Sequence, residues 1–570
     1  MAGQNPYEPY RSQVDYKNDI LAHCSNRGIE LYKHQIGMIN LILNGRRVLV
    51  AAEMGTGKTL ASIIALEMFD CDDVLWIGPK TPLDAVKLDF KKWGTELNTT
   101  FMTYEGAKNR AKAWVGDYPS AIVFDESSKL KNNKAQRSVA AYNLCRELHE
   151  DAAIISLSGT PAAKKPTDYW HQIEILCPGF IKERDIFQFT ERLAFMDEGQ
   201  GTDGHMFKQV KCWKDSEDLC AECGDHKEDW KHPIEHQFVP SKNEIKRLGD
   251  NLAGIMGVWF KKDCTDLPEL RFEKFYCKPT EQMLQIAEAA VASTTRGCDA
   301  LIMLRTISDG FKYIKVDNNK RQPCEQCEEG KIIQYIDPVA PHDPLSATER
   351  EQGTRMDGDK VVPITAIEKK YIDCYTCGGT GQTIIYDQEV EEVHSPKLDA
   401  LEHIMGNHEE VGRLNVFAGF HGSIDRIVRH CNSLGWNTFR IDGRGWEWKS
   451  PEGTPVGLTN EQMLQLFQKQ LPNYPDKVVF VGHPMAAGMG ITLHAAPTSV
   501  FYSNDFSPEN RLQACARGHR LGMLPNGGLI IDLIHLDSDK LVIDSLERSE
   551  NLQSISMNAV LETFGGSNGS

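Results

Sequence analysis

Residues 52–59 read AEMGTGKT, a glycine-rich stretch that ends in Gly-Lys-Thr. An apolar run at 47–51 (RVLVA) comes directly before it, and a helical stretch (TLASIIALEMF) begins at Thr59. A strand, a glycine-rich loop and a helix in this order predict a phosphate-binding loop, because Gly55 and Gly57 let backbone N–H groups approach an anion that the helix N-terminus attracts. A chain with such a loop is expected to have an α/β fold, in which helices cover a β-sheet.

Two side chains of this loop carry its expected chemistry. Lys58 can reach the terminal phosphates of a nucleotide, and the Thr59 hydroxyl can ligate Mg²⁺. The usual first glycine of such loops is Ala52 here. A chance glycine turn is the alternative, but the flanking strand and helix argue against it. We expect the nucleotide to be bound by Met54, Gly55, Thr56, Gly57, Lys58 and Thr59.

A second apolar run, 121–124 (AIVF), ends in two acids, Asp125 and Glu126. Open α/β sheets place their ligands at the carboxyl ends of strands. We expect Asp125 to hold Mg²⁺ through water, and Glu126 to orient and deprotonate the attacking water. A helix N-cap is the alternative role for these residues, but the phosphate loop upstream favours nucleotide hydrolysis.

Short apolar runs alternate with helical stretches in two separate parts of the chain. This pattern predicts buried parallel strands, and hence an α/β fold with two sheets on either side of a middle region. The remaining runs are 74–78 and 153–158 in the first part, and 415–418, 438–441, 478–481, 499–502 and 529–533 in the second.

Length, charge and cysteine content limit the number of domains, the cellular compartment and the partners that the chain can have. The chain has 570 residues, enough for about three or four domains. It contains no apolar run long enough to span a membrane and no secretory signal, so we expect a cytoplasmic protein whose 16 cysteines are thiols or metal ligands. The net charge of −17 argues against nucleic acid as a partner, although a local basic groove could still bind it.

The motifs in their order resemble superfamily 2 helicases and translocases, specifically the Swi/Snf-like branch of prokaryotic or phage type. The resemblance covers about 30–180, 395–550 and part of the middle region. It is carried by the phosphate loop and by LYKHQIGMINLI, DESSKLKN (with Lys131 and Asn132), LSGTPAAKKPTDYW (with Ser158, Gly159, Thr160 and Pro161), FKKDCTDLPEL, SPKLDALEHIM, AAGMGITLHAA and NDFSPENRLQACARGHRLG.

The resemblance implies two RecA-like lobes of the P-loop NTPase type that close on ATP. It implies adenine recognition by Gln35 and a nucleotide contact at Gly490. On a helix, Gln513, Arg517 and Arg520 would share one face, and the two arginines would clamp the γ-phosphate from the second lobe. The sequence departs from the family at Ser128, where a histidine is usual, and at Gly518 and Met523.

Two cysteine clusters in the middle region predict structural zinc sites, since four protein ligands leave no position for water. One has the pattern of two CxxC pairs, and the other follows C-x2-C-x8-H-x3-H. Cys212 and His226 compete as ligands in the second cluster, and reduced, metal-free turns are the alternative for the first. The expected ligands are Cys324, Cys327, Cys374 and Cys377, and Cys220, Cys223, His232 and His236.

These expectations combine into an ATP-dependent DNA translocase that moves on duplex DNA as a monomer, with ATP, Mg²⁺ and Zn²⁺. The alternatives are a strand-separating helicase, a nucleotide kinase, which would leave Arg517 unexplained, and a non-motor zinc-bearing nucleic-acid-binding protein. The expected domains are an N-terminal segment (1–29), the first lobe (30–190), a helical protrusion with the Cys/His cluster (191–316), a four-cysteine zinc-ribbon-like insertion and linker (317–394), the second lobe (395–550) and a flexible tail (551–570).

Overall fold

A computed structural model gives the arrangement of the chain, which divides into two compact units. The first unit comprises Met1–Asp309 and Ser395–Ser570, and the second comprises Gly310–His394. The residues that the structure describes are 14–111, 116, 118–200, 206–229, 236–264, 267–293, 297–337, 340–346, 350–351, 354–357, 360–364, 367–485, 491–520, 523 and 527–565.

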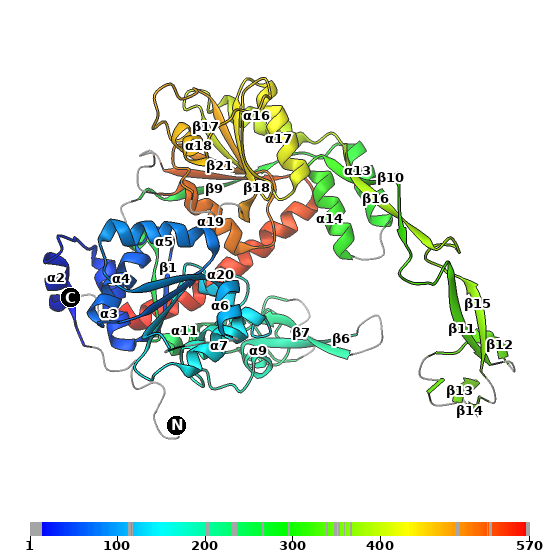
Figure 1. The fold of residues 1–570 in the computed structure, drawn as a ribbon, viewed down its shortest axis with the longest axis horizontal. Coiled ribbons are helices and arrows are strands. Elements are labelled where there is room, and N and C mark those ends of the chain that lie inside the picture. Colours follow the sequence, from blue (N-terminus) through cyan, green and yellow to red (C-terminus); the bar gives the residue numbers. More distant parts are fainter. Residues whose placement is uncertain are drawn as a thin grey trace. The chain divides into compact units, whose positions relative to one another are not determined.

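The first sheet of the first unit has six strands, all parallel. It is drawn mainly in blue and cyan in Figure 1. Its strand order is β3 (Thr99–Thr103), β2 (Val74–Gly78), β4 (Ala121–Asp125), β5 (Ala153–Ser158), β1 (Arg47–Ala52) and β8 (Met256–Trp259). We call this sheet and the helices that cover it the first lobe.

Helices cover both faces of the first sheet. Side chains along each strand point alternately to opposite faces, so both sets can be buried under these helices. Val48 and Val50 pack under α3 and α4, whereas Leu49 and Ala51 pack toward α7 and α8. The helices are α2 (Lys17–Ser25), α3 (Lys33–Gly45), α4 (Lys58–Met68), α5 (Lys80–Trp93), α6 (Tyr104–Ala111), α7 (Gln136–Glu147), α8 (Tyr169–Leu176) and α9 (Ile186–Leu193), with the short turns η1 (Ser127–Leu130) and η2 (Pro166–Asp168).

The second sheet has seven strands and forms the second lobe with its helices. All its neighbouring strands are parallel except the edge pair β18–β19. The strand order is β19 (Gly445–Lys449), β18 (Asn437–Asp442), β20 (Val478–Gly482), β17 (Arg413–Phe417), β21 (Thr498–Phe501), β22 (Gly528–Ile534) and β9 (Leu270–Tyr276), and the helices are α16 (Pro396–Gly406), α17 (His421–Ser433), α18 (Asn460–Phe467) and α19 (Pro508–Gly518).

The α/β fold class is confirmed, but the middle region is less helical than expected. Residues 191–316 contribute β8 to the first sheet and β9 to the second. They also form a hairpin of β6 (Ala194–Gln200) and β7 (Met206–Trp213). The helices of this region are α11 (Glu244–Leu252), α12 (Lys261–Cys264), α13 (Glu281–Ala292) and α14 (Gly297–Ser308).

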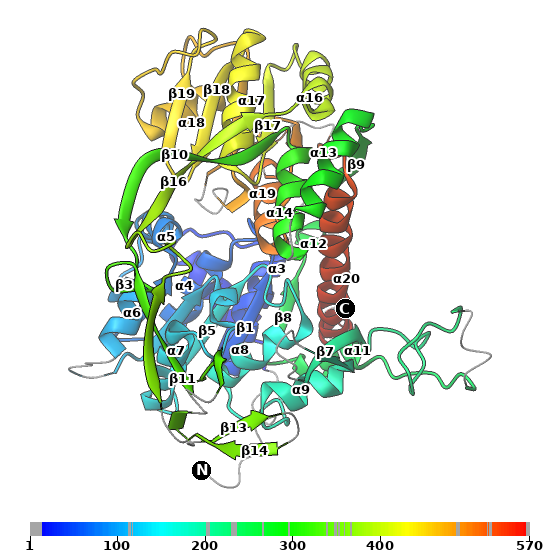
Figure 2. The same ribbon diagram turned by 90° about the vertical axis from the view of Figure 1, so that its right-hand side faces the viewer.

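Residues 551–565 differ from the flexible tail that we expected. They continue helix α20 (Asp537–Gly565), which leaves the second lobe and packs against α11 of the first (Figure 2). Leu552, Met557 and Val560 are buried in the core of the first lobe. This apolar face holds the end of the chain in place, and 566–570 lie outside the described residues.

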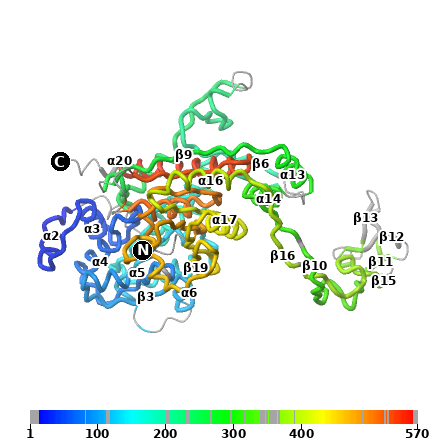
Figure 3. The backbone as a smooth tube through the Cα atoms, turned by 90° about the horizontal axis from the view of Figure 1, so that it is seen from above, coloured from blue at the N-terminus to red at the C-terminus, as the bar shows by residue number. Residues whose placement is uncertain are grey.

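The second unit begins with a long antiparallel ribbon of β10 (Phe311–Pro323) and β16 (Gln382–Glu392), whose strands run side by side (Figure 3). A three-stranded sheet follows, in the order β12 (Ala340–Pro344), β11 (Lys331–Asp337) and β15 (Glu368–Asp373). A hairpin joins β13 (Thr354–Asp357) to β14 (Lys360–Pro363). Across the described parts of both units, no helix has the length and apolar character needed to cross a membrane.

Candidate nucleotide and metal sites

The glycine-rich loop bends sharply between β1 and α4. Gly55 and Gly57 have φ angles of 87° and 81°, which side chains other than glycine rarely adopt. A Cβ atom on Gly57 would also lie 2.2 Å from Nε2 of Gln35. Gln35 is held there because its Oε1 accepts a hydrogen bond of 3.0 Å from the backbone N–H of Tyr32. The loop is therefore shaped by both its glycines and the buried glutamine.

Lys58 lies inside this loop. Its Nζ donates to the backbone carbonyls of Ala52 at 2.5 Å and Glu53 at 3.3 Å. Burial lowers the pKa of the Lys58 ammonium, while the carboxylates of Glu126 and Asp125 oppose that shift. A buried ammonium is stabilised by nearby negative charge, so phosphate oxygens in this loop would favour the charged form of Lys58.

The two acids occupy the end of β4 and the residue after it. The backbone N–H of Glu126 donates to Oδ1 of Asp125 at 3.1 Å, and Glu126 has a left-handed φ of 54°. Burial raises the pKa of both carboxyl groups, that of Glu126 to about 7, although Lys58 opposes the shift. A carboxylate with this pKa can accept a proton from water near neutral pH.

A cavity of about 580 Å³ lies beside the loop, within the roughly 300–1,000 Å³ of small-molecule sites. Its walls come from both lobes. The predicted site residues that line it are Gln35, Met54, Gly55, Gly57, Lys58, Thr59, Asp125 and Glu126 of the first lobe, and Gln513, Arg517 and Arg520 of the second.

One of the predicted nucleotide-binding residues that the structure describes, Thr56, is not among those that line this cavity. The Thr56 side chain is buried and its hydroxyl donates to the carbonyl of Glu53 at 2.8 Å, so it shapes the loop from within. Gly490 lies outside the described residues.

Arg517 is a buried cation at the wall of the cavity. Its side chain is 2% exposed, and within the described part of the chain its Nε has no hydrogen-bond partner. Burial and the neighbouring Arg520 lower the pKa of Arg517 to about 9, and Glu126 opposes the shift. A buried guanidinium with an unpaired Nε–H is costly, so an anionic ligand with several acceptor oxygens would stabilise it.

The structure corrects the placement of Arg520. We expected Arg520 to share a helix face with Gln513 and Arg517, but α19 ends at Gly518 and Arg520 follows in a bend. Its NH1 donates to Oγ1 of Thr492 at 3.0 Å. All three side chains still line the cavity, because the chain turns back toward it after the helix.

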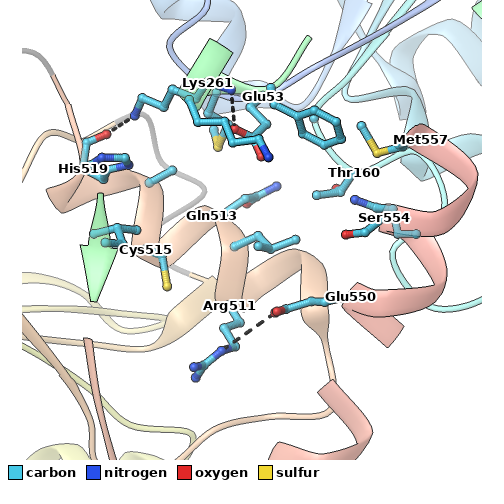
Figure 4. A pocket seen from close by; sticks show the side chains of 18 of the residues that line it. Glu53, Thr160, Lys261, Arg511, Gln513, Cys515, His519, Glu550, Ser554 and Met557 are labelled. Carbon is cyan, nitrogen blue, oxygen red and sulfur yellow. Dashed lines mark hydrogen bonds and ion pairs between the residues drawn. The ribbon is translucent and has the colours of Figure 1, made fainter. Parts of the chain in front are cut away.

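A second cavity, of about 520 Å³, lies between α19, α20 and the first lobe (Figure 4). Lys261, from the segment after β8, donates its backbone N–H to Oε2 of Glu53 at 2.7 Å and its Nζ to the carbonyl of His519. Met54, Glu126 and Gln513 line both cavities. The sequence identified this segment only as a family motif, and its contacts with the phosphate loop and the second lobe emerge from the structure.

The four predicted cysteines of the second unit come together. The Sγ atoms of Cys324 and Cys374 are 3.8 Å apart, and those of Cys327 and Cys377 are 3.6 Å apart. A zinc ion with four thiolates at about 2.3 Å would separate the sulfurs by about 3.8 Å. The cluster therefore has the dimensions of a tetrahedral zinc site, and it could hold a zinc ion.

The mixed cluster of the first unit is described only in part. Cys220, Cys223 and His236 lie together, with 3.2 Å between Sγ of Cys220 and Nε2 of His236. His232 lies outside the described residues. The competing Cys212 is not in this group. Its Sγ instead donates to the carbonyl of Gly224 at 3.2 Å. Three of the four expected ligands are thus placed within reach of one ion.

Comparisons with known proteins agree with these motifs. The chain is 20% identical over 525 residues to the lymphoid-specific helicase of Homo sapiens, across 84% of this chain and 56% of that protein. It is 30% identical over 161 residues to the CHD3-type chromatin-remodeling factor PICKLE of Arabidopsis thaliana, across 26% of this chain and 11% of that protein. The chain therefore spans between about a tenth and a little over half of these relatives. No family model matches.

Among solved structures, the chain is similar to the Sulfolobus solfataricus SWI2/SNF2 ATPase core in complex with dsDNA. The two are 17% identical, 94% of this chain and 95% of that one are covered, and the TM-score is 0.34.

Proposed function

We propose that this protein hydrolyses ATP with Mg²⁺ in the cavity between its two lobes and uses the hydrolysis to move on duplex DNA. One observation carries the proposal. The phosphate loop and the paired acids line the same cavity as Arg517 and Arg520 of the other lobe. A nucleotide there would touch both lobes, so its hydrolysis would change how they interact.

Each predicted residue has a distinct task in this proposal. Lys58 and the loop N–H groups bind the phosphates, and Glu126 takes a proton from the attacking water. Thr59, and Asp125 through water, would hold a magnesium ion, which would supply positive charge beside the phosphate oxygens. Arg517 and Arg520 stabilise the charge that develops on the γ-phosphate.

We propose duplex DNA as the substrate on which the protein moves. The chain resembles the Swi/Snf-like branch and is similar to the lymphoid-specific helicase and to the chromatin-remodeling factor PICKLE. Triplex displacement tests this proposal: a translocase strips a third strand from a duplex while ATP is hydrolysed. Displacement of one strand of a forked duplex, without triplex displacement, would favour the strand-separating alternative. If the protein displaces neither the third strand nor a strand of the forked duplex, it does not move on DNA as proposed. ATP turnover then tests the proposed hydrolysis separately.

We also propose two structural zinc ions. The first is held by Cys324, Cys327, Cys374 and Cys377, and the sulfur distances support this ligand set. The second is held by Cys220, Cys223, His232 and His236, three of which lie together in the described residues.

A further inference from the structure

A buried carboxylate of the second lobe contacts the turn that carries the paired acids of the first. Oε1 of Glu509 accepts hydrogen bonds from Oγ of Ser128 at 3.0 Å and from Nζ of Lys129 at 3.1 Å. Glu509 is 7% exposed and Ser128 is 1% exposed. Both donors belong to η1, which begins directly after Glu126. The contact therefore joins the two lobes within a few residues of the proposed catalytic base.

The local structure on each side fixes this contact. Glu509 lies in the first turn of α19, where the positive end of the helix dipole stabilises a carboxylate. On the other side, the left-handed conformation of Glu126 turns the chain, and the N–H of Lys129 donates to the carbonyl of Glu126 at 3.0 Å. Because Glu126, Ser128 and Lys129 share one tight turn, a displacement of Ser128 or Lys129 also moves Glu126.

The same turn is also bonded inside the first lobe. Oγ of Ser127 donates to Oε1 of Gln172 at 3.1 Å, and Nε2 of Gln172 donates to the carbonyls of Pro161 at 2.7 Å and Asp168 at 2.9 Å. These bonds connect the turn to the Ser158–Pro161 motif. The turn is thus held on one side by Gln172 and on the other by Glu509, without the histidine that is usual at Ser128.

We propose that Glu509 is a positioning residue for nucleotide hydrolysis: it holds the Glu126 turn against α19, so that base and arginines face one nucleotide. The inference rests on the proposed hydrolysis of ATP. α19 also carries Gln513 and Arg517, which line the nucleotide cavity. One rigid helix therefore sets the position of Glu126 through its first turn and that of the arginine through its last.

Steady-state ATP turnover of the full chain, at saturating ATP and duplex DNA, tests this inference. The variants are E509A, E509Q, S128A and the double variant S128A/E509A, and the affinity for a fluorescent ATP analogue is measured beside the turnover number. E461A is the matched control, because Glu461 also lies in the first turn of its helix, α18, but is exposed. Melting temperatures separate positioning from loss of fold.

We expect E509A to lower the turnover number about tenfold or more, because a buried charge-assisted hydrogen bond is lost, while nucleotide affinity changes less than about threefold. E509Q keeps an acceptor oxygen for Ser128 but removes the negative charge that strengthens the bonds from Ser128 and Lys129, so its loss should be smaller than that of E509A but still about threefold or more. The double variant should be no slower than E509A, since Ser128 acts through Glu509. E461A should match the wild type.

Wild-type turnover in a folded E509A, or effects of S128A and E509A that multiply fully, would overturn the inference. If E509A does not fold, E509Q decides, and a turnover number within about twofold of the wild type overturns it. A wild-type chain that hydrolyses no ATP would contradict the proposed function instead.

Discussion

Glu126 of the first lobe and Arg517 of the second line the same cavity, and the Glu126 carboxylate opposes the lowering of the Arg517 pKa by burial, although one residue follows strand β4 and the other lies in helix α19. Their charges attract, which stabilises the cationic form of Arg517 at the cost of burying both groups. A nucleotide between them would bring γ-phosphate oxygens to the arginine and an attacking water to the carboxylate. This pair therefore places the proposed chemistry at the boundary of the two lobes.

Replacement of Lys58 by alanine should reduce ATP turnover roughly 100-fold or more, because the loop loses its charged phosphate contact. Turnover measured with a coupled assay checks this, and Lys87→Ala is the control because Lys87 is exposed on the neighbouring helix α5. Equal turnover in the two variants would argue against the phosphate loop.

Replacement of Glu126 by glutamine should preserve ATP binding and reduce turnover roughly 10²- to 10⁴-fold, since the amide cannot take a proton from water. Equilibrium binding of a fluorescent ATP analogue, together with single-turnover hydrolysis, separates the two steps. Hydrolysis at the wild-type rate would mean that another group is the base.

Replacement of Arg517 by lysine should reduce turnover by roughly 10³-fold, because an ammonium cannot form the planar, paired hydrogen bonds of a guanidinium. Binding of ADP, which lacks the γ-phosphate, should change little. The contrasting result, a loss of ADP affinity with normal turnover at saturating ATP, would place Arg517 away from the γ-phosphate.

Elemental analysis of the purified chain should find about two zinc ions per molecule. Cys377→Ser and Cys223→Ser should each lose one ion, because each removes a ligand from a different cluster. Cys298→Ser is the control, since Cys298 is exposed and lies outside both clusters. A preparation without zinc would contradict both sites together.

Replacement of Gly249 by alanine should destabilise the chain by about 1–3 kcal/mol. A Cβ atom there would lie 2.3 Å from the carbonyl oxygen of Ser556, so α11 and α20 would have to separate. Urea unfolding measures the change. Gly406→Ala is the control, because a Cβ at the end of α16 meets nothing within 4 Å. Equal midpoints for the two variants would show that this helix contact contributes little.

The parts of the fold that local pattern determines were predictable. The runs at 74–78 and 153–158 coincide with β2 and β5, because buried parallel strands are continuously apolar. The phosphate loop and the two acids line one cavity because the carboxyl ends of parallel strands meet at the same edge of a sheet.

The rest depends on contacts between distant segments. β9 reads LRFEKFY and is mostly exposed, so only its pairing with β22 makes it a strand. Glu509 gave no signal in the sequence, since its importance comes from meeting Ser128 of the other lobe. Leu552, Met557 and Val560 are buried only because α20 packs on the first lobe, whereas the glycine- and serine-rich residues 565–570 alone indicate a flexible tail.

ATP turnover of the wild-type chain alone and with duplex DNA, single-stranded DNA or RNA, at fixed salt, tests whether this protein is a motor that moves on duplex DNA. We expect slow turnover of the chain alone, and stimulation by duplex DNA that exceeds the stimulation by single-stranded DNA or RNA. Turnover that none of the three nucleic acids raises would contradict this expectation.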